Sequence, residues 1–173
     1  WSACAAILAE KSMQIEVAGA DFLMICTNTM HLVAPEIEDA IGIPLLHIAD
    51  ATAARVKAAG IEKIGLLGTR FTMEEDFYKG RLERHGLEVL VPSEDDMDIV
   101  HRVIYKELCL GKIRDDSRAE FLRIIDELSA RGAGGVIEGC TEIVMLVQQE
   151  HTDVKLFDTT EIHAIEAVAE ALR

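Results

Sequence analysis

Residues 19–29 (GADFLMICTNT) and residues 132–142 (GAGGVIEGCTE) are the two stretches that decide the fold. Each places Gly-Ala after a helical pattern, continues with a short apolar run and ends in a polar tip. An apolar run of this length, bounded by turn residues, is typical of a strand buried on both faces of a parallel sheet. Because the two stretches lie in different halves of the chain, their likeness indicates an internal repeat and two related lobes.

The remaining chain alternates between helical and strand patterns in the same way. Helices are predicted at about 3–18, 35–41, 50–59, 73–85, 94–109, 115–131 and 160–172, with another directly after Cys140. Strands are predicted at about 20–26, 44–48, 63–67, 87–91, 135–138 and 154–157. This alternation predicts an α/β fold with parallel sheets, in which ligands bind beyond the carboxyl ends of the strands. Those ends fall at residues 26–29, His47, residues 68–69 and residues 139–142.

The composition excludes several classes of partner. The formal net charge of −14 argues against binding to nucleic acid or to an anionic membrane. An anionic substrate would need a locally positive site, which backbone N–H groups at helix starts can supply. No apolar run approaches the roughly 20 residues that span a bilayer, and the first residues lack the basic start and the cleavage site of a signal peptide, so we expect a cytoplasmic protein.

The four cysteines show no metal-binding spacing. No pair forms a CxxC motif, so a structural zinc site is not expected. Cys109 lies within a helical pattern and is predicted to be part of the core. Cys26 and Cys140 follow apolar strands, where a ligand would bind.

The register of the repeat bears on which residues act together. Aligned without a gap, Thr27 lies opposite Cys140, and Cys26 lies opposite Gly139. Since side chains alternate along a strand, Cys26 and Thr27 should point in different directions. We predict that Thr27 faces a substrate opposite Cys140, with Cys26 turned towards the lobe interior. The alternative, in which Cys26 is the reactive group, stays open.

These residue types suit proton transfer at an amino-acid Cα. Racemisation without a cofactor needs one group to remove the Cα proton and another to return a proton on the opposite face. Thiols suit this role because their pKa is about 8.5 and falls near a helix N-terminus. Donors are needed to stabilise charge on the substrate carboxylate. Residues of that kind near the strand ends are Asn28, Thr29, Thr72 and Thr141.

Four motifs carry a resemblance to a known family. They are CTNTMH (26–31), LLGTRFTMEEDFY (66–78), GCTE (139–142) and FDTTEIHA (157–164). Together they resemble the aspartate/glutamate racemases across essentially the whole chain. The resemblance implies two pseudo-symmetric lobes, each a mostly parallel sheet flanked by helices, with the active site between them and no pyridoxal phosphate or metal. It implies catalytic roles for Thr27, Cys140 and Cys26, and substrate binding by Asn28, Thr29, Thr72, Thr141 and Glu142.

The sequence departs from the family pattern in three places. Relatives usually begin with a strand and a Gly-rich loop upstream of Trp1, so we expect residues to be missing and the first lobe to lack its N-terminal strand. Thr27 stands at the usual cysteine position, and Glu142 stands where many relatives have His. On this basis residues 1–45 and 158–173 are assigned to the first lobe and residues 46–157 to the second.

Several alternatives remain at the level of sequence. A related enzyme, such as a hydantoin racemase or an arylmalonate decarboxylase, would suit a site with one thiol, and a non-catalytic domain that binds a small ligand would keep the same fold. The preferred amino acid is not decided, and a homodimer is one oligomeric state left open. His31, His47 and His163 are expected to serve as structural hydrogen-bonding groups, and Asp158 as a helix cap.

Overall fold

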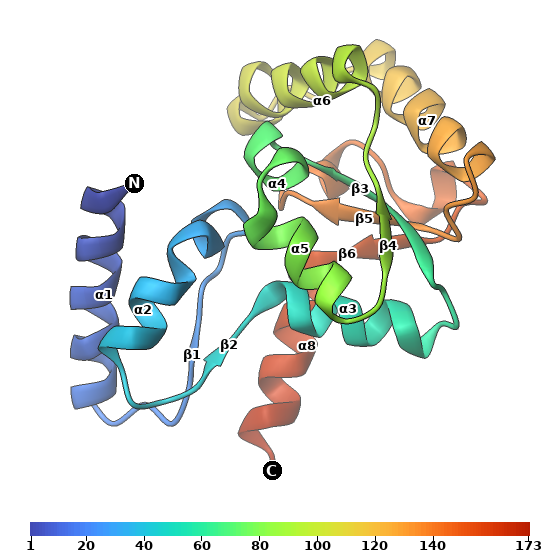
Figure 1. Ribbon diagram of the computed structural model, residues 1–173. Coiled ribbons are helices and arrows are strands. Elements are labelled where there is room, and N and C mark those ends of the chain that lie inside the picture. The colour runs from blue at the N-terminus through green and yellow to red at the C-terminus, as the bar shows by residue number, and fades with distance from the viewer.

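The computed structural model describes all 173 residues, which form two parallel sheets with helices packed around them (Figure 1). The helices are α1 (Ser2–Val17), α2 (Ala34–Ala40), α3 (Ile48–Ala58), α4 (Arg70–Glu74), α5 (Asp76–Arg84), α6 (Glu94–Lys106), α7 (Asp115–Ala130) and α8 (Thr159–Ala171). The strands are β1 (Leu23–Met24), β2 (Leu45–Leu46), β3 (Lys63–Gly68), β4 (Glu88–Leu90), β5 (Val136–Gly139) and β6 (Leu156–Asp158). Four 3-10 turns are η1 (Thr29–Val33), η2 (Leu108–Leu110), η3 (Ile143–Met145) and η4 (Gln149–His151).

The larger sheet has the strand order β4-β3-β5-β6, with every neighbouring pair parallel. Successive residues of a strand face opposite sides, so Leu67 packs against α6 and α7 while Leu66 packs against α3 and α5. Figure 1 shows α6 and α7 on one side of this sheet and α3 on the other. Because both faces are covered, the strands carry continuous apolar runs, as predicted.

The smaller sheet pairs β1 with β2 in parallel, with Leu23 opposite Leu45. Its small core gathers Ala5 of α1 and Ile37 of α2 around Leu23 and Ile25. Helix α8 packs along α3, and His163 Nε2 bonds to Leu46 O at the end of β2. The assignment of residues 1–45 with 158–173 to one lobe, and of residues 46–157 to the other, stays a prediction.

The predicted elements are found in order, with two corrections. The helix predicted at 73–85 begins at Arg70 and is interrupted at Glu75, whose backbone is extended. The α-helix predicted after Cys140 is absent, and residues 143–151 form only η3 and η4. Local side-chain bonds compete with a helix there, because the Gln149 amide bonds to Thr152 O, Val154 O and Leu156 N.

Other sequence predictions are confirmed. Helix α1 ends before Gly19 and α7 before Gly132, and both glycines adopt the positive φ that closes a helix cheaply. Asp158 caps α8 by accepting bonds from Thr160 N and Glu161 N. No helix combines the length and the apolar character needed to cross a bilayer.

One carboxyl group lies inside the larger sheet. Glu138 of β5 is only 3% exposed, and its Oε1 has no hydrogen-bond partner. Its neighbour in the sheet register is Asp158 of β6. Burial, followed by the nearby charge of Asp158, raises the pKa of Glu138 to about 8 from its ordinary value of 4.5. The folded protein therefore holds this group protonated at neutral pH.

We predict that Glu138→Gln makes the protein progressively more stable than the wild type as pH rises from about 4.5 to 8. In that window folded Glu138 is protonated and the unfolded residue is ionised, so the wild type loses stability with rising pH by up to about 1.4 kcal/mol per pH unit. Urea unfolding of both proteins at a series of pH values measures the difference.

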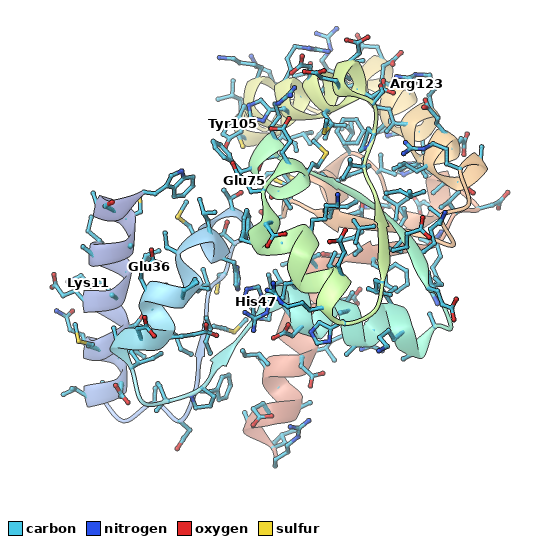
Figure 2. The ribbon with its side chains drawn as sticks, in the orientation of Figure 1. Lys11, Glu36, His47, Glu75, Tyr105 and Arg123 are labelled. Atoms are coloured by element: carbon cyan, nitrogen blue, oxygen red, sulfur yellow. The ribbon has the colours of Figure 1, made fainter.

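The interval from pH 7 to 8 gives the cleanest reading. The buried His31 and His47 have pKa values lowered to about 4 and about 2, so their contribution changes only below their ordinary value of 6.5. Glu36→Gln removes an exposed carboxyl on α2 and should follow the wild type (Figure 2). Parallel curves for Glu138→Gln and the wild type would contradict the assignment.

Candidate active site

A pocket of about 240 Å³ lies where the segments that follow β1, β3 and β5 meet. This is the carboxyl edge of parallel strands, where the sequence predicted a ligand. Six of the predicted site residues line it: Thr27, Asn28, Thr29, Cys140, Thr141 and Glu142. Cys26 and Thr72 are not among the lining residues.

A tight turn orients the first motif. Thr27 N donates to Ile25 O at 2.8 Å, which ends the extended path of β1. Thr27 lines the pocket, whereas Cys26 is exposed at the surface. The predicted burial of Cys26 in the lobe interior is therefore wrong, because the turn replaces the simple alternation of a strand.

His31 holds the same turn from behind. Its Nε2 accepts a bond from Ile48 N at 3.3 Å, so the ring proton lies on Nδ1, which donates to Thr27 O at 2.8 Å. Burial lowers the pKa of His31 to about 4, which keeps the imidazole neutral. The backbone of Thr27 is thereby tied to the start of α3.

The other two predicted structural histidines surround His31. His47 caps α3 by accepting a bond from Ala49 N, and its ring centroid lies 4.3 Å from that of His31. Figure 2 shows His47 at the start of α3, beside the end of β2. His163 of α8 bonds to Leu46 O at 2.8 Å. The expected hydrogen-bonding roles of all three histidines are confirmed.

Asn28 connects the first motif to the larger sheet. Its Nδ2 donates to Thr159 Oγ1 at 3.0 Å, and that hydroxyl donates to Glu138 O at 2.9 Å. Asn28 is 2% exposed, and its Oδ1 has no partner in the protein. Asn28 also lines the pocket, and its Oδ1 still lacks the hydrogen-bond donor that a buried oxygen requires.

A chain of hydroxyls forms another part of the lining. Thr29 Oγ1 and Thr69 Oγ1 lie 3.3 Å apart, and Thr69 Oγ1 lies 3.3 Å from Thr72 Oγ1. Thr72 is fully buried, so it reaches the pocket only through Thr69. The sequence had indicated residues 68–69 as a strand end where a ligand would bind, and the hydroxyl of Thr69 suits a carboxylate ligand.

Cys140 is held as a thiol. Its Sγ donates to Glu142 Oε2 at 2.9 Å, and Thr141 Oγ1 donates to the same oxygen at 2.8 Å. Burial, followed by the bond to Glu142, raises the pKa of Cys140 well above its ordinary range. The lowered thiol pKa expected from a helix start is wrong, because burial and the carboxylate of Glu142 raise the pKa and only the short turn η3 follows.

Glu142 itself is ionised in this arrangement. Burial works to raise its pKa, but the bonds from Cys140 and Thr141 outweigh burial and lower it. Glu142 is also the only charged side chain in the pocket lining. Carboxylates of a ligand would therefore meet hydroxyl and N–H groups of the lining.

Sequence reasoning missed part of the lining. Cys109 is exposed in η2 and borders the pocket, so its predicted place in the core is wrong. The reason is that α6 ends at Lys106, which rotates Cys109 away from the apolar face of that helix. Tyr105 also lines the pocket from α6 (Figure 2). Trp1 and Phe71 also line the pocket, and their rings pack edge to face with the centroids 5.5 Å apart.

No three His, Cys, Asp or Glu side chains gather in an arrangement that could hold a metal ion.

Comparison with known proteins gives a consistent picture. The family model described as Asp/Glu/Hydantoin racemase matches residues 1–167. The crystal structure of a candidate Asp/Glu racemase from Yersinia pestis is 52% identical, with a TM-score of 0.95, covering 100% of this chain and 76% of that one. An aspartate racemase homologue from Pyrococcus horikoshii OT3 is 34% identical, with a TM-score of 0.88, covering 98% and 74%.

A curated relative is more distant. The broad specificity amino-acid racemase RacX of Bacillus subtilis (strain 168) is 23% identical over 149 residues, which is 86% of this chain. The chain spans 64% of the length of that relative.

We predict that Glu142→Gln increases the reactivity of Cys140. The substitution removes the negative charge that opposes the thiolate, and each unit by which the pKa falls gives about tenfold more thiolate at a pH below it. The rate of alkylation by iodoacetamide at pH 8, followed at Cys140 by peptide mass spectrometry, measures the effect. Glu75→Gln alters an exposed carboxyl between α4 and α5 and should leave the rate unchanged (Figure 2). Equal or slower alkylation in Glu142→Gln would rule out this role for Glu142.

Proposed function

This chain belongs to the Asp/Glu/hydantoin racemase family, and we propose that it racemises aspartate or glutamate by cofactor-independent proton transfer at Cα. One observation carries the proposal. Thr27 and Cys140, which occupy matching positions in the two repeated segments, line one pocket together with Asn28, whose Oδ1 has no hydrogen-bond partner. That arrangement supplies one proton-transferring group from each repeat and, in Asn28, an acceptor for an ammonium group.

The proposed reaction uses the two groups on opposite faces of the substrate. The Cys140 thiolate removes the Cα proton and becomes a thiol, while the Thr27 hydroxyl gives a proton to the other face. In the reverse direction the thiol returns its proton to Cα. The charge that develops on the α-carboxylate is stabilised by donors such as the hydroxyls of Thr29 and Thr69.

The resting thiol must lose its proton before it can act as a base. The carboxylate of Glu142 lies 2.9 Å from Sγ and is in place to accept that proton. The raised pKa of Cys140 opposes the transfer in the empty pocket. An ammonium group of the substrate that lies nearer to Sγ than to the carboxylate of Glu142 would favour it, because it stabilises the thiolate more than the carboxylate. We therefore infer that the amino acid itself promotes activation of Cys140.

Asn28 is the proposed partner of that ammonium group. Its Oδ1 is buried and unpartnered, which costs free energy until a donor binds. Its Nδ2 is fixed on Thr159, so the orientation of the amide is set before the substrate enters. A preset acceptor of this kind favours amino acids over analogues that carry no hydrogen-bond donor at the same position.

A second reaction suits the same pocket. Thr27 is a far weaker acid and base than a thiol, so the pocket has a strong proton-transferring group on one side only. Decarboxylation of a malonate requires delivery of a proton to one face alone. Release of carbon dioxide from an arylmalonate, without exchange of the Cα proton of aspartate, would favour this second reaction.

We predict that Cys140→Ala lowers the exchange of the Cα proton of aspartate and glutamate by about 10²–10⁴-fold, the usual effect of losing a general acid–base group. Exchange is followed by NMR in deuterium oxide for both enantiomers. Cys109→Ala is the matched control, because Cys109 is another thiol of the same pocket with no proposed proton transfer. Near-full exchange in Cys140→Ala would overturn the assignment.

We predict that Thr27→Cys raises kcat in the slower direction of racemisation more than in the faster one. A thiol would then replace a weakly acidic hydroxyl on one face only. Because the two enantiomers have equal free energies, kcat/KM must be the same in both directions, so the asymmetry is read from kcat. Circular dichroism of each pure enantiomer at saturation gives both values.

Two variants decide between Thr27 and Cys26. Cys26→Ser should have little effect, since Cys26 is exposed and outside the pocket lining. Thr27→Val should remove the second proton-transferring group while keeping the shape of the side chain. Loss of exchange in Cys26→Ser, with normal exchange in Thr27→Val, would show that Cys26 is the reactive residue.

A further inference from the structure

A second hollow of about 370 Å³ lies between residues 144–149 and the start of α8. We call it the Glu138 groove. It is lined by Glu138, Val144, Val147, Gln148, Gln149, Leu156, Asp158 and Glu161. None of these residues lines the pocket around Cys140, although β5 and the segment after it contribute to both.

The charges of the groove are all negative. Glu138 and Asp158 are in register on neighbouring parallel strands, so their side chains leave the same face of the sheet side by side. Glu161 contributes a third carboxyl from the first turn of α8. The groups that face Glu138 from the other elements are the amides and apolar side chains of residues 144–149, and no basic residue lines the groove.

Glu138 lacks the partner that a buried carboxyl requires. Only 3% of its surface is exposed, and its Oε1 makes no hydrogen bond. Asp158, by contrast, accepts bonds from Thr160 N and Glu161 N, which fix its position. Gln149 is also occupied, because its amide bonds only to backbone atoms. The unsatisfied polar group of this region is therefore Glu138, and it faces the groove.

We propose that the Glu138 groove binds a primary alkylammonium group, with the nitrogen between the carboxyls of Glu138 and Asp158. An ammonium group supplies three donors and a positive charge, which are the features that this pair lacks. The short alkyl stem would lie against Val144, Val147 and Leu156. A divalent cation fits less well, because calcium takes six to eight oxygen ligands and an apolar wall offers none.

Binding at this groove is linked to the loss of a proton. Burial and the charge of Asp158 keep Glu138 protonated at pH 7, with a pKa of about 8. A cation bound beside it favours the ionised form, so binding at pH 7 displaces the proton. Affinity therefore rises with pH up to about 8, and release of the proton of Glu138 is the signature of this binding.

The test is isothermal titration calorimetry of the purified protein with n-butylammonium chloride at pH 7, with potassium chloride at the same ionic strength as reference. Titrations in two buffers of different ionisation enthalpy measure the protons released. We expect saturable binding with release of close to one proton. Glu138→Gln should weaken binding by about tenfold or more and abolish the proton release.

Control variants locate the binding. Glu36→Gln removes an exposed carboxyl from α2 and should bind as the wild type does. Val144→Lys places an ammonium group on the rim of the groove and should prevent binding. This variant keeps the proposal testable if Glu138→Gln folds poorly. Glu142→Gln should leave binding intact, because Glu142 belongs to the other pocket.

Three results would overturn the proposal. The first is the absence of saturable heat with n-butylammonium. The second is equal affinity and equal proton release in the wild type, Glu138→Gln and Val144→Lys. The third is binding of calcium chloride, lost in Glu138→Gln, where n-butylammonium does not bind, which would assign the groove to a divalent cation.

Discussion

The hydroxyl of Thr159 joins the two motifs that form the pocket. It accepts a bond from Asn28 of the first motif and donates one to Glu138 O, two residues before Cys140. Thr159 is fully buried, so water cannot replace either bond, and breaking one would leave a buried polar group unsatisfied. The separation of Asn28 from the strand that precedes Cys140 is thereby fixed. The pocket depends on this bridge because its lining is drawn from both sheets.

Uncharged polar groups provide the support around this bridge. His31 ties Thr27 O to the start of α3, and burial keeps its imidazole neutral. Thr29, Thr69 and Thr72 are linked through their hydroxyl groups alone. Neutral groups can be buried at small cost when they are hydrogen-bonded, whereas buried charges cannot. The charge in the lining is thus left to Glu142, which bonds directly to Cys140.

The two carboxyls near Cys140 behave in opposite ways because their partners differ. Glu142 receives two hydrogen bonds and stays ionised, with a lowered pKa. Glu138 receives none, lies beside Asp158 and is protonated at neutral pH. One strand and its following turn therefore carry a fixed negative charge on the pocket side and a neutral acid on the groove side. Only the first of these is predicted from the sequence as a site residue.

The sequence alone determined the alternation of strands and helices and the glycines that end helices, and it showed the repeat from which the pairing of Thr27 with Cys140 is predicted. These features follow from periodicity and spacing, which can be read from residues that are close together in the sequence. The sequence could not predict the turn that exposes Cys26, the rotation that brings Cys109 to the pocket, or the raised pKa of Cys140. Tertiary structure decided these, because burial and hydrogen-bond partners depend on residues far apart in the chain, such as Asn28 and Thr159.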